Sequence, residues 1–162
     1  NPSAAMYIAN ACGADFIRQK VFIGAMIKAG GVINGRAGEV WEARKDMDGP
    51  VSVLTDIYDR TGVPLGPLPI ETAAGQVLKY GSDGLILTGR NFGESLELVD
   101  RVRKHFPQAP VYLGGGITEK NVGEAIPHCD GMIVSSCLLE DGKDNEWSRQ
   151  KIKSFMDCVH GQ

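Results

Sequence analysis

The sequence lacks several features that would point to common classes of protein. No apolar run approaches the roughly 20 residues that cross a bilayer, and no signal peptide is visible. The formal net charge is only -3, which gives neither the basic surface typical of nucleic-acid binding nor a polybasic membrane segment. The four cysteines form no CxxC pair, which favours reduced thiols over a disulfide framework. We therefore expect a cytoplasmic protein without a transmembrane segment or a nucleic-acid partner.

Histidine is also scarce. His105, His128 and His160 fall in or after expected helices, so no Ser-His-Asp triad and no zinc-ligand set follows from the sequence. We predict no metal site and assign no cofactor.

What is present is a regular alternation of strands and helices in a chain of 162 residues, the size of a single domain. Strands are expected at residues 14–23, 51–57, 83–88, 111–113 and 131–134, and helices at 3–11, 36–47, 70–80, 94–106, 119–126 and 147–159. Residues 24–35 are expected to form a loop. Nearly continuous apolar strands between helices indicate a parallel sheet covered by helices.

Two architectures fit this alternation. One is a doubly wound parallel sheet, and the other is a (β/α)8 barrel, which needs eight strands and about 250 residues. The start without Met and the small-residue turns at the ends of two consecutive strands favour the barrel. There is also a weak internal repeat: Asp15, Asp83 and Asp130 each stand where a helix ends and a strand begins, and are expected to be structural caps. The chain opens on Asn1 without Met, so we expect that three strands of the barrel lie upstream. About five βα units would then be present, as a partial barrel that is not a stable monomer and associates with further copies.

The most informative stretch is residues 111–118, Val-Tyr-Leu-Gly-Gly-Gly-Ile-Thr. A short apolar strand is followed by Gly114, Gly115 and Gly116, which leave backbone N–H groups uncovered, and Thr118 is expected to cap the next helix. Ser135 and Ser136 follow the next strand in a second turn of small residues. Because barrels commonly bind phosphate after strands seven and eight, the two turns predict one phosphate or anion site. Ordinary turn chemistry is the alternative.

Several segments, in the same order, resemble the BtpA/SgcQ family, which is named for a protein implicated in photosystem I accumulation and for a sugar-operon protein. The resembling segments are residues 10–18, 22–25, 33–39, 55–56, 83–89, 113–118, 121–122, 130–134 and 139–142. The resemblance implies a TIM barrel of which this chain is the C-terminal two-thirds, but it implies no defined reaction. Lys20 stands where the family usually has Asn, and Tyr58, Arg60 and Thr61 replace a His- and Lys-rich run.

Candidate catalytic residues lie on or after the strands. Lys20 and Asp56 are candidate acid/base groups, because each lies toward the carboxyl end of an expected strand, where barrels place their chemistry. The alternative for Lys20 is a structural cation paired with a carboxylate, and the alternative for Asp56 is a loop-capping aspartate. Arg18 is expected to be a structural cation bonded to a carboxylate.

Further candidate ligand-binding residues are Arg36, Thr88 and Arg90. Thr88 ends a strand, and Arg90 follows in a position from which an arginine can clamp a phosphate. Arg36 lies beside a glycine-rich loop and can reach a ligand or pair with Glu39.

We therefore expect a barrel protein that binds a small phosphorylated or anionic metabolite, with isomerase, epimerase or lyase chemistry on a sugar-phosphate-like substrate. The alternative is a non-enzymatic assembly or stability factor, such as one for photosystem I. A nucleotide-binding or phosphatase role ranks third, because the glycine turn lacks the GK[ST] ending of a P-loop.

Overall fold

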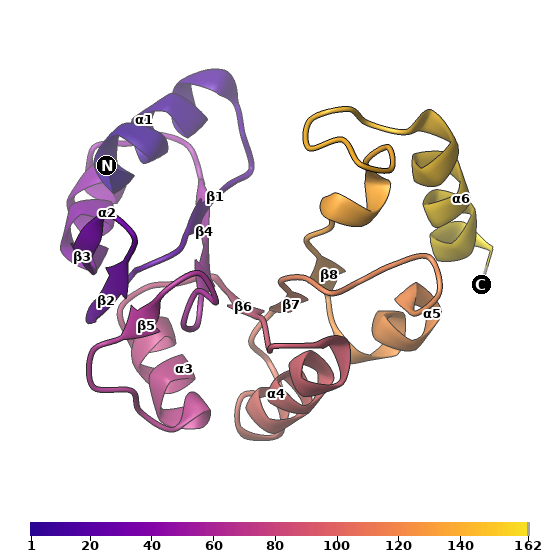
Figure 1. Cartoon of the computed structure of the whole chain (residues 1–162). Helices are drawn as coiled ribbons and strands as arrows, with labels where there is room; N and C mark the ends of the chain where they lie inside the picture. The colour runs from indigo at the N-terminus through magenta and orange to yellow at the C-terminus, as the bar shows by residue number, and fades with distance from the viewer. Residues whose placement is uncertain (162) are drawn as a thin grey trace.

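A curved parallel sheet of five strands forms the centre of the computed structural model, which describes residues 1–161 (Figure 1). The strands are β1 (Phe16–Gln19), β4 (Ser52–Asp56), β6 (Gly84–Leu87), β7 (Val111–Leu113) and β8 (Gly131–Met132). They pair in that order and all run parallel. The outer strands β1 and β8 each pair on one side only, as expected for an incomplete barrel, and the expected homo-oligomer stays a prediction.

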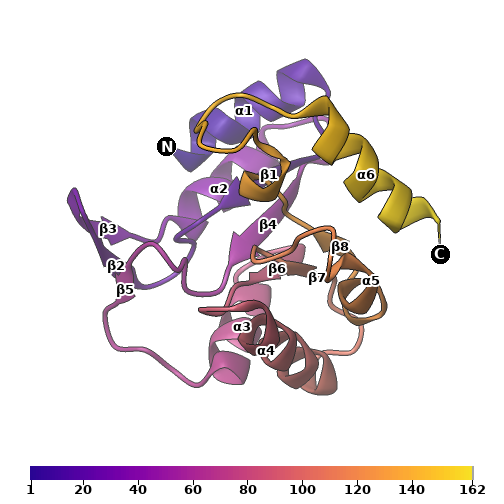
Figure 2. The same cartoon turned by 45° about the vertical axis from the view of Figure 1, so that its right-hand side comes forward.

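Helices form an arc on the outer side of this sheet (Figure 1). They are α1 (Pro2–Cys12), α2 (Ala37–Lys45), α3 (Ile70–Lys79), α4 (Phe92–His105), α5 (Val122–Ala125) and α6 (Arg149–His160), with short 3-10 turns η1 (Ile126–His128) and η2 (Ser136–Leu138). In Figure 2 the five strands follow one another across the middle, from β1 to β8. Among residues 1–161, every helix is too short or too polar to cross a membrane.

The core lies between the sheet and the helix arc. All four residues of β6 are buried, which explains why this strand reads as a continuous apolar run. Helix α4 buries Leu96, Val99 and Val102 at helical spacing, and Asn91 caps its first turn by accepting a hydrogen bond from the Glu94 N–H at 2.9 Å. The four cysteines are free.

The strand order decides between the two expected architectures. In a doubly wound sheet the strand order reverses at a switch point, and helices cover both faces. Here the order follows the sequence without reversal, and the sheet curls inside its helices. The doubly wound alternative is therefore wrong, and the fold is an α/β half-barrel.

A second, antiparallel sheet replaces the loop that was expected at residues 24–35. Strands β2 (Ala25–Lys28) and β3 (Gly31–Asn34) form a hairpin, and β5 (Val63–Pro64) pairs with the other edge of β2. Gly31 takes a left-handed conformation, with φ 110°, at the turn. The strands are short, and β3 is exposed along its whole length, so the sequence carries no clear alternation there.

Two expected boundaries are also corrected. Strand β1 ends at Gln19 rather than at residue 23, so Lys20 follows the strand. Helix α5 begins at Val122 after Asn121, not after Thr118, because the Asn121 side chain accepts a hydrogen bond from the Thr118 N–H at 2.7 Å. This contact holds residues 118–121 in a turn and delays the helix.

Candidate functional site

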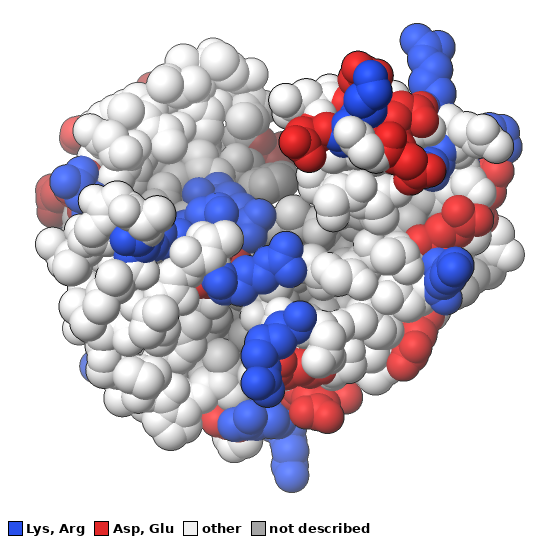
Figure 3. Space-filling model, viewed as in Figure 1, with Lys and Arg blue, Asp and Glu red and all other residues white. Residues whose placement is uncertain are grey.

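A hollow of about 200 Å³ opens at the carboxyl ends of the parallel strands. Its lining contains eight of the ten predicted site residues: Lys20, Asp56, Thr88, Gly114, Gly115, Gly116, Ser135 and Ser136. Arg18, Asp59, Arg60 and Thr61 also line it. We call this space the anion hollow. Lys and Arg side chains gather toward the middle of this face of the molecule (Figure 3).

The turn after β7 forms one wall of the anion hollow. Gly114 must be glycine, because a Cβ there would overlap the Thr88 hydroxyl and approach Ile86 Cγ2 within 2.8 Å. Gly116 is left-handed, with φ 78°. The Gly114 N–H donates to the Leu87 carbonyl at 2.8 Å, whereas the Gly115 and Gly116 N–H groups find no acceptor within residues 1–161. Two backbone donors are therefore free at the hollow.

Thr88 contributes a buried hydroxyl to the same wall. In the described part of the chain, Thr88 Oγ1 is one of two buried side-chain polar atoms without a hydrogen-bond partner. An unsatisfied buried hydroxyl costs free energy, so such atoms mark places where a ligand or water completes the structure. The Thr88 hydroxyl thus supports a polar ligand next to Gly114.

Arg60 faces the glycine turn from the loop after β4. Its Cζ, Nη1 and Nη2 atoms each lie 3.8 Å from the position that a Cβ on Gly115 would occupy. Arg60 makes no hydrogen bond or ion pair with any other residue in the range 1–161. Arg60 is not among the ligand groups predicted from the sequence, although a cation in the loop that follows a barrel strand was an available signal.

Asp56 forms a bidentate ion pair with Arg18. Arg18 Nε and Nη2 donate to the two carboxylate oxygens of Asp56 at 2.8 and 2.7 Å, and the Asp56 side chain is 3% exposed. The hydrogen bonds to Asp56 raise the pKa of Arg18 above its usual value. The expected structural role of Arg18 fits this two-pronged contact.

Asp59 is the centre of a second charged cluster. This cluster joins the antiparallel sheet of β2, β3 and β5, which we call the small sheet, to the anion hollow. It is buried, and it accepts hydrogen bonds from Lys28 of β2 and from the hydroxyl and N–H of Thr61 at 2.8 and 3.1 Å. Lys20 Nζ lies 3.6 Å from its carboxylate. Burial acts to raise the pKa of Asp59, but the hydrogen bonds from Lys28 and Thr61 and the charge of Lys20 outweigh it and lower this pKa to about 2.

Arg36 and Arg90 lie outside the anion hollow. Arg36 Nη1 pairs with Glu39 at 3.2 Å, which was the alternative considered for it. Arg90 Nε pairs with Glu94 at 2.9 Å, and its side chain is 89% exposed. Both short-range pairs turn the guanidinium groups back onto their own helices.

The fold and this site define an α/β half-barrel with a polar hollow at the carboxyl ends of its strands. Comparison with known families identifies it further: the BtpA family model matches residues 1–161, so the chain belongs to the BtpA family. It is 36% identical over 149 residues to the photosystem I biogenesis protein BtpA of Synechocystis, covering 88% of this chain and 51% of that protein. It is 34% identical over 140 residues to an uncharacterized protein of Pyrococcus furiosus, covering 85% and 53%. The chain thus spans about half the length of these relatives.

Solved structures share the fold at low sequence identity. The phosphoribosyl anthranilate isomerase of Thermococcus kodakaraensis is 22% identical, with a TM-score of 0.61 over all of this chain and 71% of that one. A 3-hexulose-6-phosphate synthase is 12% identical, with a TM-score of 0.62 over 97% of this chain and 68% of that one. These likenesses establish a TIM-barrel-like fold.

Proposed function

We propose that the anion hollow binds the phosphate or other anionic group of a small metabolite. The observation that carries this proposal is the convergence of unpartnered donors on one space: the N–H groups of Gly115 and Gly116, the Thr88 hydroxyl and the Arg60 guanidinium. Ser135 and Ser136, in the turn after β8, line the same hollow. Uncovered backbone N–H groups together with a guanidinium are suited to a phosphate.

The chemistry that we propose is isomerase, epimerase or lyase chemistry on a sugar-phosphate-like substrate. Two proteins with the same fold are named for such compounds, phosphoribosyl anthranilate and 3-hexulose 6-phosphate. Lys20 is the residue we favour for proton transfer, because its side chain is half exposed and lines the hollow. Asp56 is also retained as a candidate, but its bidentate contact favours a role in fixing Arg18.

Binding of inorganic phosphate to the full chain, measured by isothermal titration calorimetry, tests the proposed site. Arg60→Gln removes one charged donor and is expected to weaken binding roughly 10- to 100-fold, since a hydrogen bond to a charged group contributes about 1.5–3 kcal/mol. Arg90→Gln is the matched control, because Arg90 lies outside the hollow. Absence of phosphate binding, or equal weakening by both substitutions, contradicts the proposal.

Turnover of a panel of sugar phosphates tests the enzymatic part. We expect Lys20→Ala to abolish turnover while phosphate affinity changes less than in Arg60→Gln. Asp56→Asn is expected to lower turnover together with stability, because it loosens Arg18. A Lys20→Ala protein that keeps full turnover excludes Lys20 as the acid/base group.

A second candidate function, a non-enzymatic assembly factor, is favoured by a different surface. The small sheet exposes Ile27, Val32, Ile33 and Val63, at 44–63% of their maximal area, and such apolar surface is suited to a protein partner. The Synechocystis relative is named a photosystem I biogenesis protein. If Lys20→Ala and Arg60→Gln leave the cellular phenotype of a deletion strain fully complemented while Val32→Asp does not, this second function replaces the first.

A further inference from the structure

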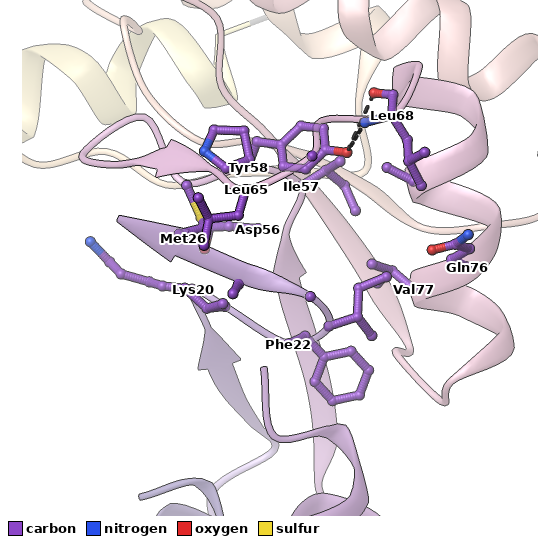
Figure 4. Close-up of a pocket in the computed structure, with 17 residues that line it drawn as sticks. Lys20, Phe22, Met26, Asp56, Ile57, Tyr58, Leu65, Leu68, Gln76 and Val77 are labelled. Carbon is purple, nitrogen blue, oxygen red and sulfur yellow. Dashed lines mark hydrogen bonds between the residues drawn. The ribbon is translucent and has the colours of Figure 1, made fainter. Parts of the chain in front are cut away.

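A second, smaller pocket adjoins the anion hollow. It measures about 90 Å³ and shares Lys20 and Asp56 with the hollow as lining residues. Its remaining walls come from the segment that joins β1 to β2 and the start of β2, from the end of β4, from the segment between β5 and α3, and from α3 (Figure 4). We call it the apolar pocket. The two spaces therefore meet at these two residues.

The floor of this pocket is hydrophobic. Phe22, Ile57, Ala73 and Val77 are each 2–4% exposed, and in Figure 4 Phe22, Ile57 and Val77 lie around one space beside α3. Charged groups occur among the lining residues only at Lys20 and Asp56, on the side shared with the anion hollow. The pocket therefore accepts an apolar group and presents charge at one end.

The rim of the pocket is held in an unfavourable backbone conformation. Tyr58 is the one non-glycine residue within residues 1–161 with a positive φ, at 61°. Its hydroxyl accepts a hydrogen bond from the Leu68 N–H at 2.7 Å, which fixes the ring across the rim (Figure 4). Leu65 and Leu68 line the same pocket and are 50% and 39% exposed. Backbone strain of this kind is found at ligand-binding sites, and two leucines at an open rim gain burial when a ligand covers them.

We propose that the ligand of this protein is a phosphomonoester with a small apolar end, whose phosphate occupies the anion hollow and whose apolar group fills the apolar pocket. This inference rests on the proposed function. An apolar cavity of about 150 Å³ holds benzene, so a pocket of 90 Å³ takes a smaller group, of roughly three to four carbons. Lys20 and Asp56 then lie beside the segment of the ligand between its two ends.

A homologous series of linear alkyl phosphates, from methyl to octyl, tests the inference against inorganic phosphate in the same titration. The expected affinity is flat while the chain passes Lys20 and Asp56. It then rises roughly threefold to fourfold per carbon for about three to four carbons, the increment for one buried methylene, and stops when the pocket is full. Phosphate binding without any dependence on chain length overturns the inference and leaves the anion site standing. Absence of phosphate binding overturns both.

Variants of α3 show whether the gain arises in this pocket. Ala73→Leu fills the space and is expected to remove the chain-length dependence while inorganic phosphate binds as before. Thr72→Leu adds the same side chain on the exposed neighbouring position and is the matched control. If Ala73→Leu does not fold, Leu68→Asn at the rim takes its place, with a smaller gain per carbon expected. A chain-length dependence that is equal in the parent, Ala73→Leu and Leu68→Asn proteins contradicts the assignment.

Discussion

Asp83 and Asp130 stand at the amino ends of the strands, and the carboxylate of each is bonded to a backbone N–H group and to an arginine side chain. Asp83 accepts from the Val53 N–H at 2.7 Å and pairs with Arg44 of α2. Asp130 accepts from the Val111 N–H at 2.8 Å and from Arg103 of α4 at 2.6 Å. At the carboxyl ends, Arg60, the Thr88 hydroxyl and the N–H groups of Gly115 and Gly116 have no partner among the described residues.

The amino ends of the strands, where polar groups are paired, form what we call the structural end of the half-barrel. The carboxyl ends, where the anion hollow opens, form its binding end. The two aspartate–arginine units are equivalent, since each joins a helix, the start of a strand and the adjacent strand. They give a physical reason for the weak sequence repeat around Asp83 and Asp130. Barrel proteins place stability at this end and chemistry at the other, so Arg60, the Thr88 hydroxyl and the two glycine N–H groups lie where a ligand is expected. The second buried side-chain atom without a partner in residues 1–161, Arg103 Nε, lies at the structural end.

Asp59 is an exception to this comparison, because it lies at the binding end and yet its carboxylate is buried and accepts several hydrogen bonds. Asp59→Asn removes a buried charge from between Lys28 and Lys20, and we expect the free energy of unfolding to fall by about 3 kcal/mol. Chemical denaturation measures the loss. Asp144→Asn, at an exposed site, is the control and is expected to change nothing measurable. A loss smaller than about 1.5 kcal/mol would show that Asp59 is not a strongly stabilising residue.

The contribution of Asp59 to stability should also appear in the pH dependence of the free energy of unfolding. The folded pKa of Asp59 is about 2, below the ordinary value of 3.8, so the unfolded chain takes up the proton first. Its contribution, about 2 kcal/mol, is therefore complete above about pH 5 and is lost progressively as the pH falls from about 5 to about 1. Unfolding free energies measured across this range in the parent and Asp59→Asn proteins should converge. Parallel pH curves for the two proteins would contradict the assigned pKa.

The sequence predicted the parallel sheet, its five strands and most of the anion hollow. It succeeded there because buried parallel strands are continuous apolar runs, and because residues 114–116 and 135–136 follow neighbouring strands and so meet at one end of the sheet. The phosphate itself stays a prediction.

The small sheet and the Asp59 cluster could not be predicted in this way. Strand β3 is exposed along its length, and β5 has only two residues, so neither carries a hydrophobic period. Lys28 and Asp59 are distant in sequence, and only the pairing of β2 with β5 brings their segments together. The pairs of Arg36 and Arg90 with a Glu in the first turn of the following helix compete with a ligand, and the sequence alone left that competition open.

The structural end can be weakened without touching the site. Asp83→Ala and Asp130→Ala each remove two hydrogen bonds, one to a backbone N–H and one to a partly exposed arginine, and we expect a loss of about 1.5 kcal/mol in each. Inorganic phosphate affinity should stay at the parent value in both variants. A loss of phosphate affinity as large as that of Arg60→Gln would show that the two ends are not independent.

The smallest expected effect is the direct coupling within each aspartate–arginine pair. A double-mutant cycle on Arg44 and Asp83 should give about 0.5 kcal/mol, because the two side chains are 28% and 43% exposed and water screens their attraction. The same cycle on Lys28 and Asp59, whose side chains are 20% and 3% exposed, should give a clearly larger value, since less water competes there. If the Arg44–Asp83 coupling is this small, most of the stabilisation by Asp83 comes from the hydrogen bond that it accepts from the Val53 N–H. Equal coupling energies in the two cycles would mean that burial does not strengthen the Lys28–Asp59 pair. Asp59 would then stabilise the binding end no more than the partly exposed pairs stabilise the structural end.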